Sequence, residues 1–141
     1  MRKLLLSILS LFAFALVANA AEIVFDMSDP NAYVAESNKV TYSTTASNGV
    51  AYSSGTVFTN GTVKMTISYA SGNGVKAFTQ TSKAIQLRVY TQAVLTFETT
   101  DGSNITKIAV SGSDFTSSKF SADCGTMGSG SWDGASNKVV L

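Results

Sequence analysis

The stretch Val63-Lys64-Met65-Thr66-Ile67-Ser68-Tyr69 alternates apolar and polar residues without a break. A period of two places the apolar side chains on one face, which predicts a β-strand buried on that face and solvated on the other. The dipeptide Asn60-Gly61 comes just before this stretch and is typical of tight hairpin turns. The sequence therefore predicts a strand that is entered through a hairpin.

The same alternation continues towards the C-terminus. Residues 84–99 predict two adjacent strands around a tight connection near Thr91-Gln92, and Asp101–Asn104 predicts a turn into a strand over Ile105–Val110. We expect the inward-facing residues of these strands to form the core: Val63, Met65, Ile67, Leu87, Val89, Leu95, Phe97, Ile108 and Val110.

The remaining segments are less regular. We expect an opening strand over residues 23–27, short strands near 39–44 and 51–53, another over 120–124 and a last one over 138–141. Residues 125–134 contain four glycines and predict a flexible loop.

Composition separates the N-terminus from the rest of the chain. Arg2-Lys3, the apolar stretch Leu4–Ala18 and the small residues of Ala18-Asn19-Ala20 predict a signal peptide over residues 1–20, cleaved before Ala21. The alternative, a membrane anchor, is disfavoured because 15 apolar residues span only about 22 Å of helix. We expect a secreted, periplasmic or cell-surface protein with no transmembrane segment after cleavage.

The mature chain, residues 21–141, has a β-rich composition. It holds 12 Val and 5 Ile against 3 Leu, and no repeat with a period of 20 to 50 residues. Its length suits one domain. We expect an all-β, antiparallel β-sandwich, jelly-roll-like, with seven to nine short strands.

Several sequence segments resemble a family of secreted β-sandwich domains of unknown function from Bacteroidetes. The similar segments are residues 21–26, 60–63, 84–90, 94–97, 104–108, 132–134 and 139–141. The resemblance implies an architecture like that of carbohydrate-binding modules and carries no catalytic signature. Such domains usually continue beyond the position that matches Leu141, so a C-terminally truncated reading frame is expected.

Counting residues excludes most catalytic chemistry. The chain has no histidine and only Cys124, which rules out His-based triads, His/Cys zinc clusters and an intrachain disulfide. Four of the nine carboxylates, Asp29, Asp101, Asp114 and Asp133, lie at predicted turn positions, where aspartate bonds its own backbone, and Glu98 lies on the polar face of a strand. We therefore expect no enzyme, no cofactor and no metal site. The Asp101–Asn104 turn could offer oxygen ligands to calcium, but its spacing matches no known loop.

Charge argues against a nucleic-acid partner. Removing Arg2 and Lys3 from the ten basic residues leaves eight, against nine acidic ones, so the mature chain carries a net charge of −1.

The leading functional hypothesis is the binding of an extracellular polysaccharide or surface glycan. A sugar site needs an exposed aromatic face with polar groups around it. Trp132 beside Asp133, and Arg88 with Tyr90 on the outer face of one strand, are the candidates. The alternative for Trp132 is a plug over the edge of the sandwich, and for Arg88 and Tyr90 an ordinary solvated face.

A second hypothesis is a structural or adhesive protein that self-associates through an exposed strand edge at the C-terminus. A third is a fragment without independent activity.

Overall fold

The computed structural model describes residues 22–42, 49–72, 74–80, 83–109, 120–128 and 130–141, so the predicted signal peptide lies outside the described part. The prediction of an all-β, antiparallel, sandwich-like fold is confirmed: the described residues form three antiparallel sheets and two short 3₁₀ helices. The elements are η1 (Pro30–Tyr33), η2 (Glu36–Asn38), β1 (Val50–Tyr52), β2 (Val57–Asn60), β3 (Val63–Ser68), β4 (Val75–Gln80), β5 (Lys83–Val89), β6 (Val94–Thr99), β7 (Ile105–Ala109), β8 (Thr126–Met127), β9 (Ser131–Ser136) and β10 (Lys138–Val140).

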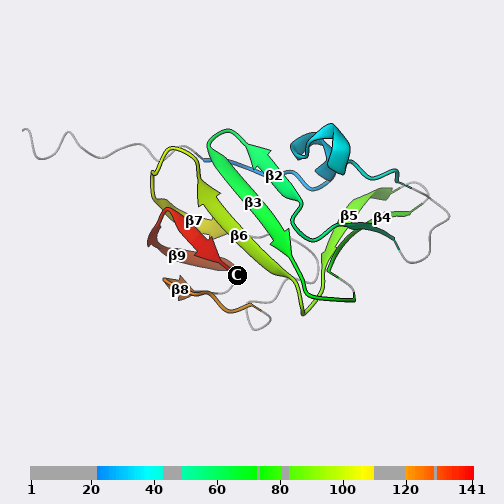
Figure 1. Ribbon diagram of the computed structural model, residues 1–141. Helices are drawn as coiled ribbons and strands as arrows, with labels where there is room; N and C mark the ends of the chain where they lie inside the picture. The colour runs from blue at the N-terminus through cyan, green and yellow to red at the C-terminus, as the bar shows by residue number, and fades with distance from the viewer. Residues whose placement is uncertain (1–21, 43–48, 73, 81–82, 110–119, 129) are drawn as a thin grey trace, which may run out of the picture.

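The four-stranded sheet has the order β10-β6-β3-β2 and lies in the middle of the molecule (Figure 1). Its β2–β3 hairpin turns at Asn60-Gly61, where Gly61 has a φ of 55°. That positive φ is what the predicted turn requires and glycine adopts it without strain. One row of apolar residues crosses all four strands on the inner face, in the order Phe58, Met65, Phe97 and Val139.

Two three-stranded sheets flank this central sheet (Figure 1). One has the order β1-β4-β5 and the other the order β7-β9-β8. The inner face of the first carries Tyr52 and Val75, which are partners in the register, and that of the second carries Ile108 opposite Trp132.

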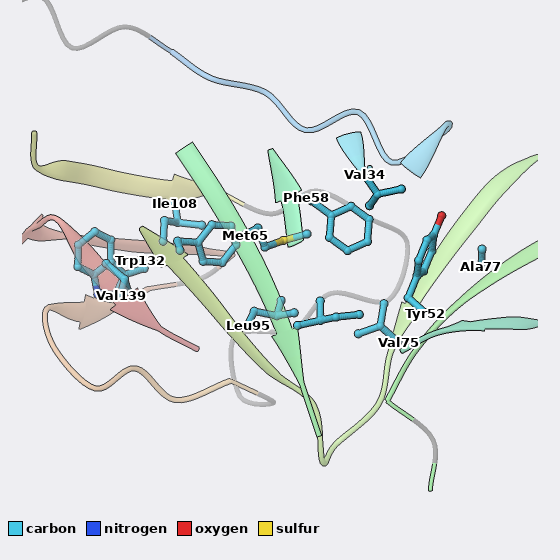
Figure 2. Packing of buried hydrophobic residues seen from close by; sticks show 12 residues of the cluster. Val34, Tyr52, Phe58, Met65, Val75, Ala77, Leu95, Ile108, Trp132 and Val139 are labelled. Carbon is cyan, nitrogen blue, oxygen red and sulfur yellow. The ribbon is translucent and has the colours of Figure 1, made fainter. Parts of the chain in front are cut away.

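The buried side chains of the three sheets form one continuous core. Figure 2 shows Trp132 and Val139 at one end and Tyr52, Val75 and Ala77 at the other, with the residues of the central sheet between them. Of the predicted core residues, those buried are Met65, Ile67, Leu95, Phe97 and Ile108. Val63, Leu87 and Val89 are partly buried and pack against this core, and Val110 lies outside the described residues.

Three local predictions are wrong. Residues 84–99 do form two strands, but β5 joins β4 in one sheet and β6 joins β3 and β10 in another, so the two are not neighbours. Residues 125–134 are not a loop, because they contain β8 and most of β9. Residues 23–27 and 120–124 form no strand, and η1 and η2 occupy the segment before residue 39.

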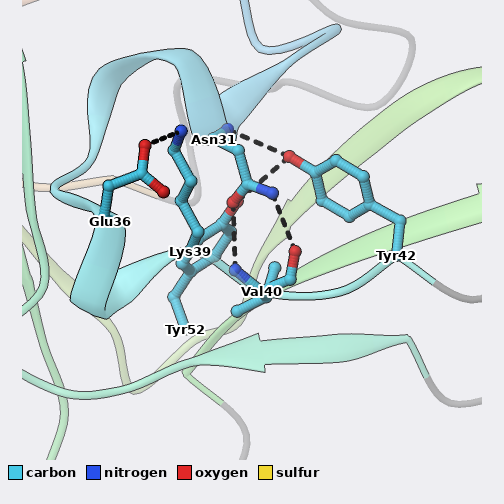
Figure 3. A network of polar contacts seen from close by, with 6 residues as sticks. All are labelled: Asn31, Glu36, Lys39, Val40, Tyr42 and Tyr52. Carbon is cyan, nitrogen blue, oxygen red and sulfur yellow. Dashed lines mark hydrogen bonds and ion pairs between the residues drawn. The ribbon is translucent and has the colours of Figure 1, made fainter.

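The N-terminal segment is fastened to the β1-β4-β5 sheet through Asn31 (Figure 3). The Asn31 side chain donates from Nδ2 to the Val40 carbonyl oxygen at 2.7 Å and accepts at Oδ1 from the Val40 N–H at 3.1 Å, so it imitates a neighbouring strand. The hydroxyl of buried Tyr52 also donates to Oδ1, at 2.9 Å, and lies 3.3 Å from the Tyr42 hydroxyl. This network leaves the polar end of Tyr52 satisfied inside the core.

Candidate functional site

Trp132 lies in the core and not in an exposed loop. It belongs to β9 and is 1% exposed, and its indole Nε1–H donates to the Cys124 carbonyl oxygen at 2.5 Å. A Cβ atom added to Gly134 would lie 2.5 Å from the indole ring, so this glycine lets the backbone approach the ring face closely. The ring is enclosed, as in the alternative of a plug, but a strand within the core carries it and not a loop over the edge of the sandwich. The indole offers no exposed face on which a sugar could stack.

Asp133 points to the opposite side of β9 and is exposed. Its carboxylate accepts a hydrogen bond from the Ser131 hydroxyl at 3.1 Å. Because successive residues of a strand face opposite sides, Trp132 and Asp133 do not belong to one surface. The structure does not bring this predicted pair together.

Arg88 and Tyr90 do lie on one surface, the outer face of the β4–β5 hairpin. The Tyr90 N–H donates to the Gly74 carbonyl oxygen at 2.9 Å, so Tyr90 continues the ladder past the end of β5. Arg88 is exposed and Tyr90 is half-buried. One residue, Val89, separates them along the chain, which puts both side chains on the same face.

Two residues of β4 complete this surface, which we call the β4–β5 outer face: Lys76, Phe78, Arg88 and Tyr90. The Arg88 guanidinium carbon lies 4.0 Å from the centre of the Phe78 ring, and Lys76 Nζ lies 5.8 Å from the centre of the Tyr90 ring. The Arg88 guanidinium therefore stacks on a ring of β4, and the Lys76 ammonium lies over the ring of Tyr90, which follows β5. Gln86 is the register partner of Phe78, and its Oε1 lies 3.5 Å from an Arg88 guanidinium nitrogen.

Lys76 and Phe78 were not found from the sequence. No strand was predicted over residues 75–80, although Val75 and Ala77 alternate there with Lys76 and Phe78 after a glycine-rich turn. The alternation of apolar and polar residues that predicts a strand is weak here, because Phe78 is apolar although it lies on the outer face. It is buried there by Arg88 and by the close approach of Gly49, where an added Cβ would meet the Phe78 ring at 2.8 Å.

The edge formed by the C-terminal strand is closed. The outward backbone groups of β10 belong to Lys138 and Val140. The Val140 N–H donates to the Asp123 carboxylate at 2.9 Å, and the Val140 carbonyl oxygen accepts from the Asp123 N–H at 3.1 Å. The Ser136 hydroxyl accepts from the Lys138 N–H and donates to the Lys138 carbonyl oxygen. This strand offers no free ladder to another chain, so the edge expected to be exposed is blocked.

The aspartates whose pKa values are shifted form hydrogen bonds within turns or at a strand edge. The pKa values of Asp26 and Asp101 are lowered, chiefly by hydrogen bonds from Ser28 and from Ser103. The pKa of Asp123 is lowered, first of all by the Val140 N–H. The lone thiol, Cys124, is half-buried and its pKa is raised by desolvation. Each aspartate therefore stabilises a turn or an edge, as expected of aspartate in such positions.

Within the described residues, no three His, Cys, Asp or Glu side chains are grouped closely enough to hold a metal ion. Over the same residues, no helix has the length and hydropathy needed to cross a membrane. Comparison with known proteins gives no matching family model, no matching curated protein and no matching solved structure.

Proposed function

We propose that this protein is a secreted, non-catalytic module that binds an extracellular glycan on the β4–β5 outer face. The observation that carries the proposal is the pairing of Tyr90 with Arg88 on one solvated surface, each held by a stacked neighbour from β4. A pyranose presents C–H groups on one face and hydroxyls around its rim. An aromatic ring and planar hydrogen-bonding groups complement those two features.

Rigid positioning supports this role. The guanidinium of Arg88 lies against the Phe78 ring, which limits the rotamers that this exposed residue can adopt. Gln86 adds an amide beside it. Less side-chain entropy is lost on binding when donors are already held in place.

A single half-buried ring makes a weak site. Stacking and the associated burial at one aromatic contribute ~1–3 kcal/mol. Such a module is useful when several copies are displayed together, because the second binding event is then intramolecular.

Export is part of the proposal. Residues 1–20 have the three regions of a signal peptide, so protein from the medium, periplasm or cell surface should begin at Ala21. Intact-mass spectrometry of the exported protein tests this. A product that retains Met1 contradicts cleavage before Ala21.

A glycan array probed with the mature protein, followed by titration of the best ligand, tests the binding function. Tyr90→Ala should remove binding while Tyr90→Phe, which keeps the ring, retains most of it. Thr59→Ala on the exposed face of β2 is the control for an unrelated surface. Binding that survives Tyr90→Ala in a folded protein places the site elsewhere, and absence of any ligand on the array contradicts the function.

The competing proposal is assembly through a strand edge, and β5, an edge strand of its sheet, is the candidate. In an antiparallel ladder, hydrogen-bonded and non-hydrogen-bonded residue pairs alternate. Because Tyr90 and Gly74 form a hydrogen-bonded pair, Lys76 and Arg88 form the next one, and their N–H and C=O groups point toward each other. Leu87 and Val89 then direct their backbone groups away from β4, at the outer edge of the sheet. Assembly at this edge would depend on protein concentration, so sedimentation equilibrium without any sugar separates the two proposals.

A further inference from the structure

The β4–β5 outer face carries an arrangement of charge that differs from the charged register pairs of the other two described sheets. On the outer face of the central sheet, Glu98 lies between Lys64 and Lys138 in the register, so opposite charges are neighbours. On the β4–β5 face, Lys76 and Arg88 are direct register partners. Like charges placed directly opposite each other destabilise a sheet.

Among the described residues, no carboxylate forms an ion pair with either cation of this pair. The next residue across the sheet from Lys76 is Ala51. The ion pair found among the described residues joins Lys39 and Glu36, and neither Lys76 nor Arg88 takes part in an ion pair there. The segment 43–48, which leads into Gly49 beside Phe78, contains no acidic residue in its sequence.

The two cations are instead held in position by aromatic rings. Phe78 is 8% exposed beneath the Arg88 guanidinium, and the Tyr90 ring lies beneath Lys76. A stacked guanidinium keeps its fork of N–H donors free at its edge, where it can bind a carboxylate or sulfate through two parallel hydrogen bonds. A locally unfavourable pair that is rigidly presented to solvent is typical of a functional site.

We infer that the ligand of this face is an acidic glycan, whose carboxylate or sulfate group is bound between Lys76 and Arg88 while Tyr90 contacts the sugar ring. This inference rests on the proposed glycan binding and specifies its substrate class. The anion removes the repulsion between the two cations. The free energy of binding the anion is therefore more favourable at the pair than at either cation alone. This difference makes the face selective for acidic over neutral polymers.

The test uses the mature protein and two matched pairs of polymers: polygalacturonate with its methyl ester, and chondroitin sulfate with desulfated chondroitin. Binding is measured by affinity electrophoresis and by calorimetry at about 50 mM and about 300 mM NaCl, because screening weakens exposed charge pairs. We expect at least one acidic polymer to bind about tenfold more tightly than its less charged counterpart. The arms also distinguish a carboxylate ligand from a sulfate ligand.

Variants test the residues. Arg88→Gln and Lys76→Gln should each weaken binding of the acidic polymer about tenfold, and Arg88→Lys should restore only part of it, because lysine lacks the planar fork. Lys64→Gln, which removes a cation that lies opposite Glu98, is the matched control and should leave binding unchanged. Neutralising either member of the like-charged pair should leave the melting temperature equal or higher, which shows that the variants fold.

Three outcomes overturn the inference. Equal binding of the acidic polymers and their less charged counterparts, or binding unaffected by Arg88→Gln, shows that the site recognises neutral sugar, and the proposed function then stands without this substrate class. Equal binding of a single-stranded oligonucleotide with the same dependence on Arg88 shows a general anion-exchange surface. Binding of no polymer and no array glycan contradicts both proposals together.

Discussion

Asp123 and Val140 bond to each other twice, with the Val140 N–H donating to the Asp123 carboxylate and the Asp123 N–H donating to the Val140 carbonyl oxygen. An aspartate outside any strand therefore takes the place that the next strand of the sheet would occupy. Natural sheets protect their edges with such devices, because a free ladder pairs readily with other chains.

Removing this protection should open the edge. Asp123→Ala leaves the Val140 N–H without its acceptor, so we expect lower stability and self-association that increases with protein concentration. Sedimentation equilibrium and thermal melting measure the two effects. Asp133→Asn, at an exposed aspartate of β9, is the control. A variant that stays monomeric at all concentrations contradicts the protective role.

The same carboxylate makes stability depend on pH. The pKa of Asp123 is lowered in the folded protein, because the ionised form accepts the Val140 N–H. The stabilisation is therefore fully present above the unfolded value of about 3.9 and is lost as pH falls through the lower folded value. Denaturant unfolding of the wild type and Asp123→Asn should show a stability difference above about pH 5 that shrinks below about pH 4. A difference that is constant with pH contradicts this linkage.

Gly134 should be essential because of the indole beside it. An added methyl would lie 2.5 Å from the Trp132 ring, so Gly134→Ala should destabilise the fold, whereas Gly128→Ala, where the nearest atom is 3.6 Å away, should be tolerated. Trp132→Phe replaces the indole with a smaller phenyl ring that lacks the distal atoms Cζ2 and Cη2, and should relieve the clash. A double-mutant cycle measured by chemical denaturation should show the two changes coupled. Additive effects contradict the direct contact.

Trp132→Ala should cost about 3–5 kcal/mol, as expected for a large buried aromatic side chain. The substitution also leaves the Cys124 carbonyl oxygen without its indole donor. Chemical denaturation measures the loss. A folded Trp132→Ala variant of unchanged stability contradicts the core position of the indole.

The hydrogen bonds of Asn31 with Val40 and Tyr52 should stabilise the packing of the N-terminal segment against β1. Tyr52→Phe removes one buried hydroxyl and should cost about 1–2 kcal/mol, whereas Asn31→Ala leaves the Val40 N–H and carbonyl unpaired and should cost more. Burial raises the pKa of Tyr52, so its contribution is present below the unfolded value of about 10 and declines as pH rises above it. Wild type should therefore lose more stability than Tyr52→Phe in alkaline unfolding experiments. Equal losses contradict the burial of the hydroxyl.

Ile67 should tolerate no charge. It is fully buried on β3, so Ile67→Asp should abolish folding, while Thr59→Asp, on the exposed side of neighbouring β2, should leave the circular dichroism melt nearly unchanged. An unaltered melt for Ile67→Asp contradicts the placement of β3.

Features that depend only on neighbours along the chain could be predicted from the amino-acid sequence. The alternation of Val63–Ser68 and the turn at Asn60-Gly61 require no distant contact, because side chains alternate across any strand and glycine permits the turn. The same local reasoning placed Arg88 and Tyr90 on one face, since they stand two residues apart.

The pairing of strands and the burial of side chains depend on contacts between segments that are distant in the sequence. β5 and β6 follow each other closely in the chain, yet they enter different sheets, because pairing is fixed by the faces that must be buried together. Trp132 stands in a glycine-rich sequence that is typical of a loop. Its burial depends on Gly134 and on a carbonyl eight residues away. Lys76 joins Arg88 only through the register of β4 and β5, and a register is a relation between two segments that neither segment encodes alone.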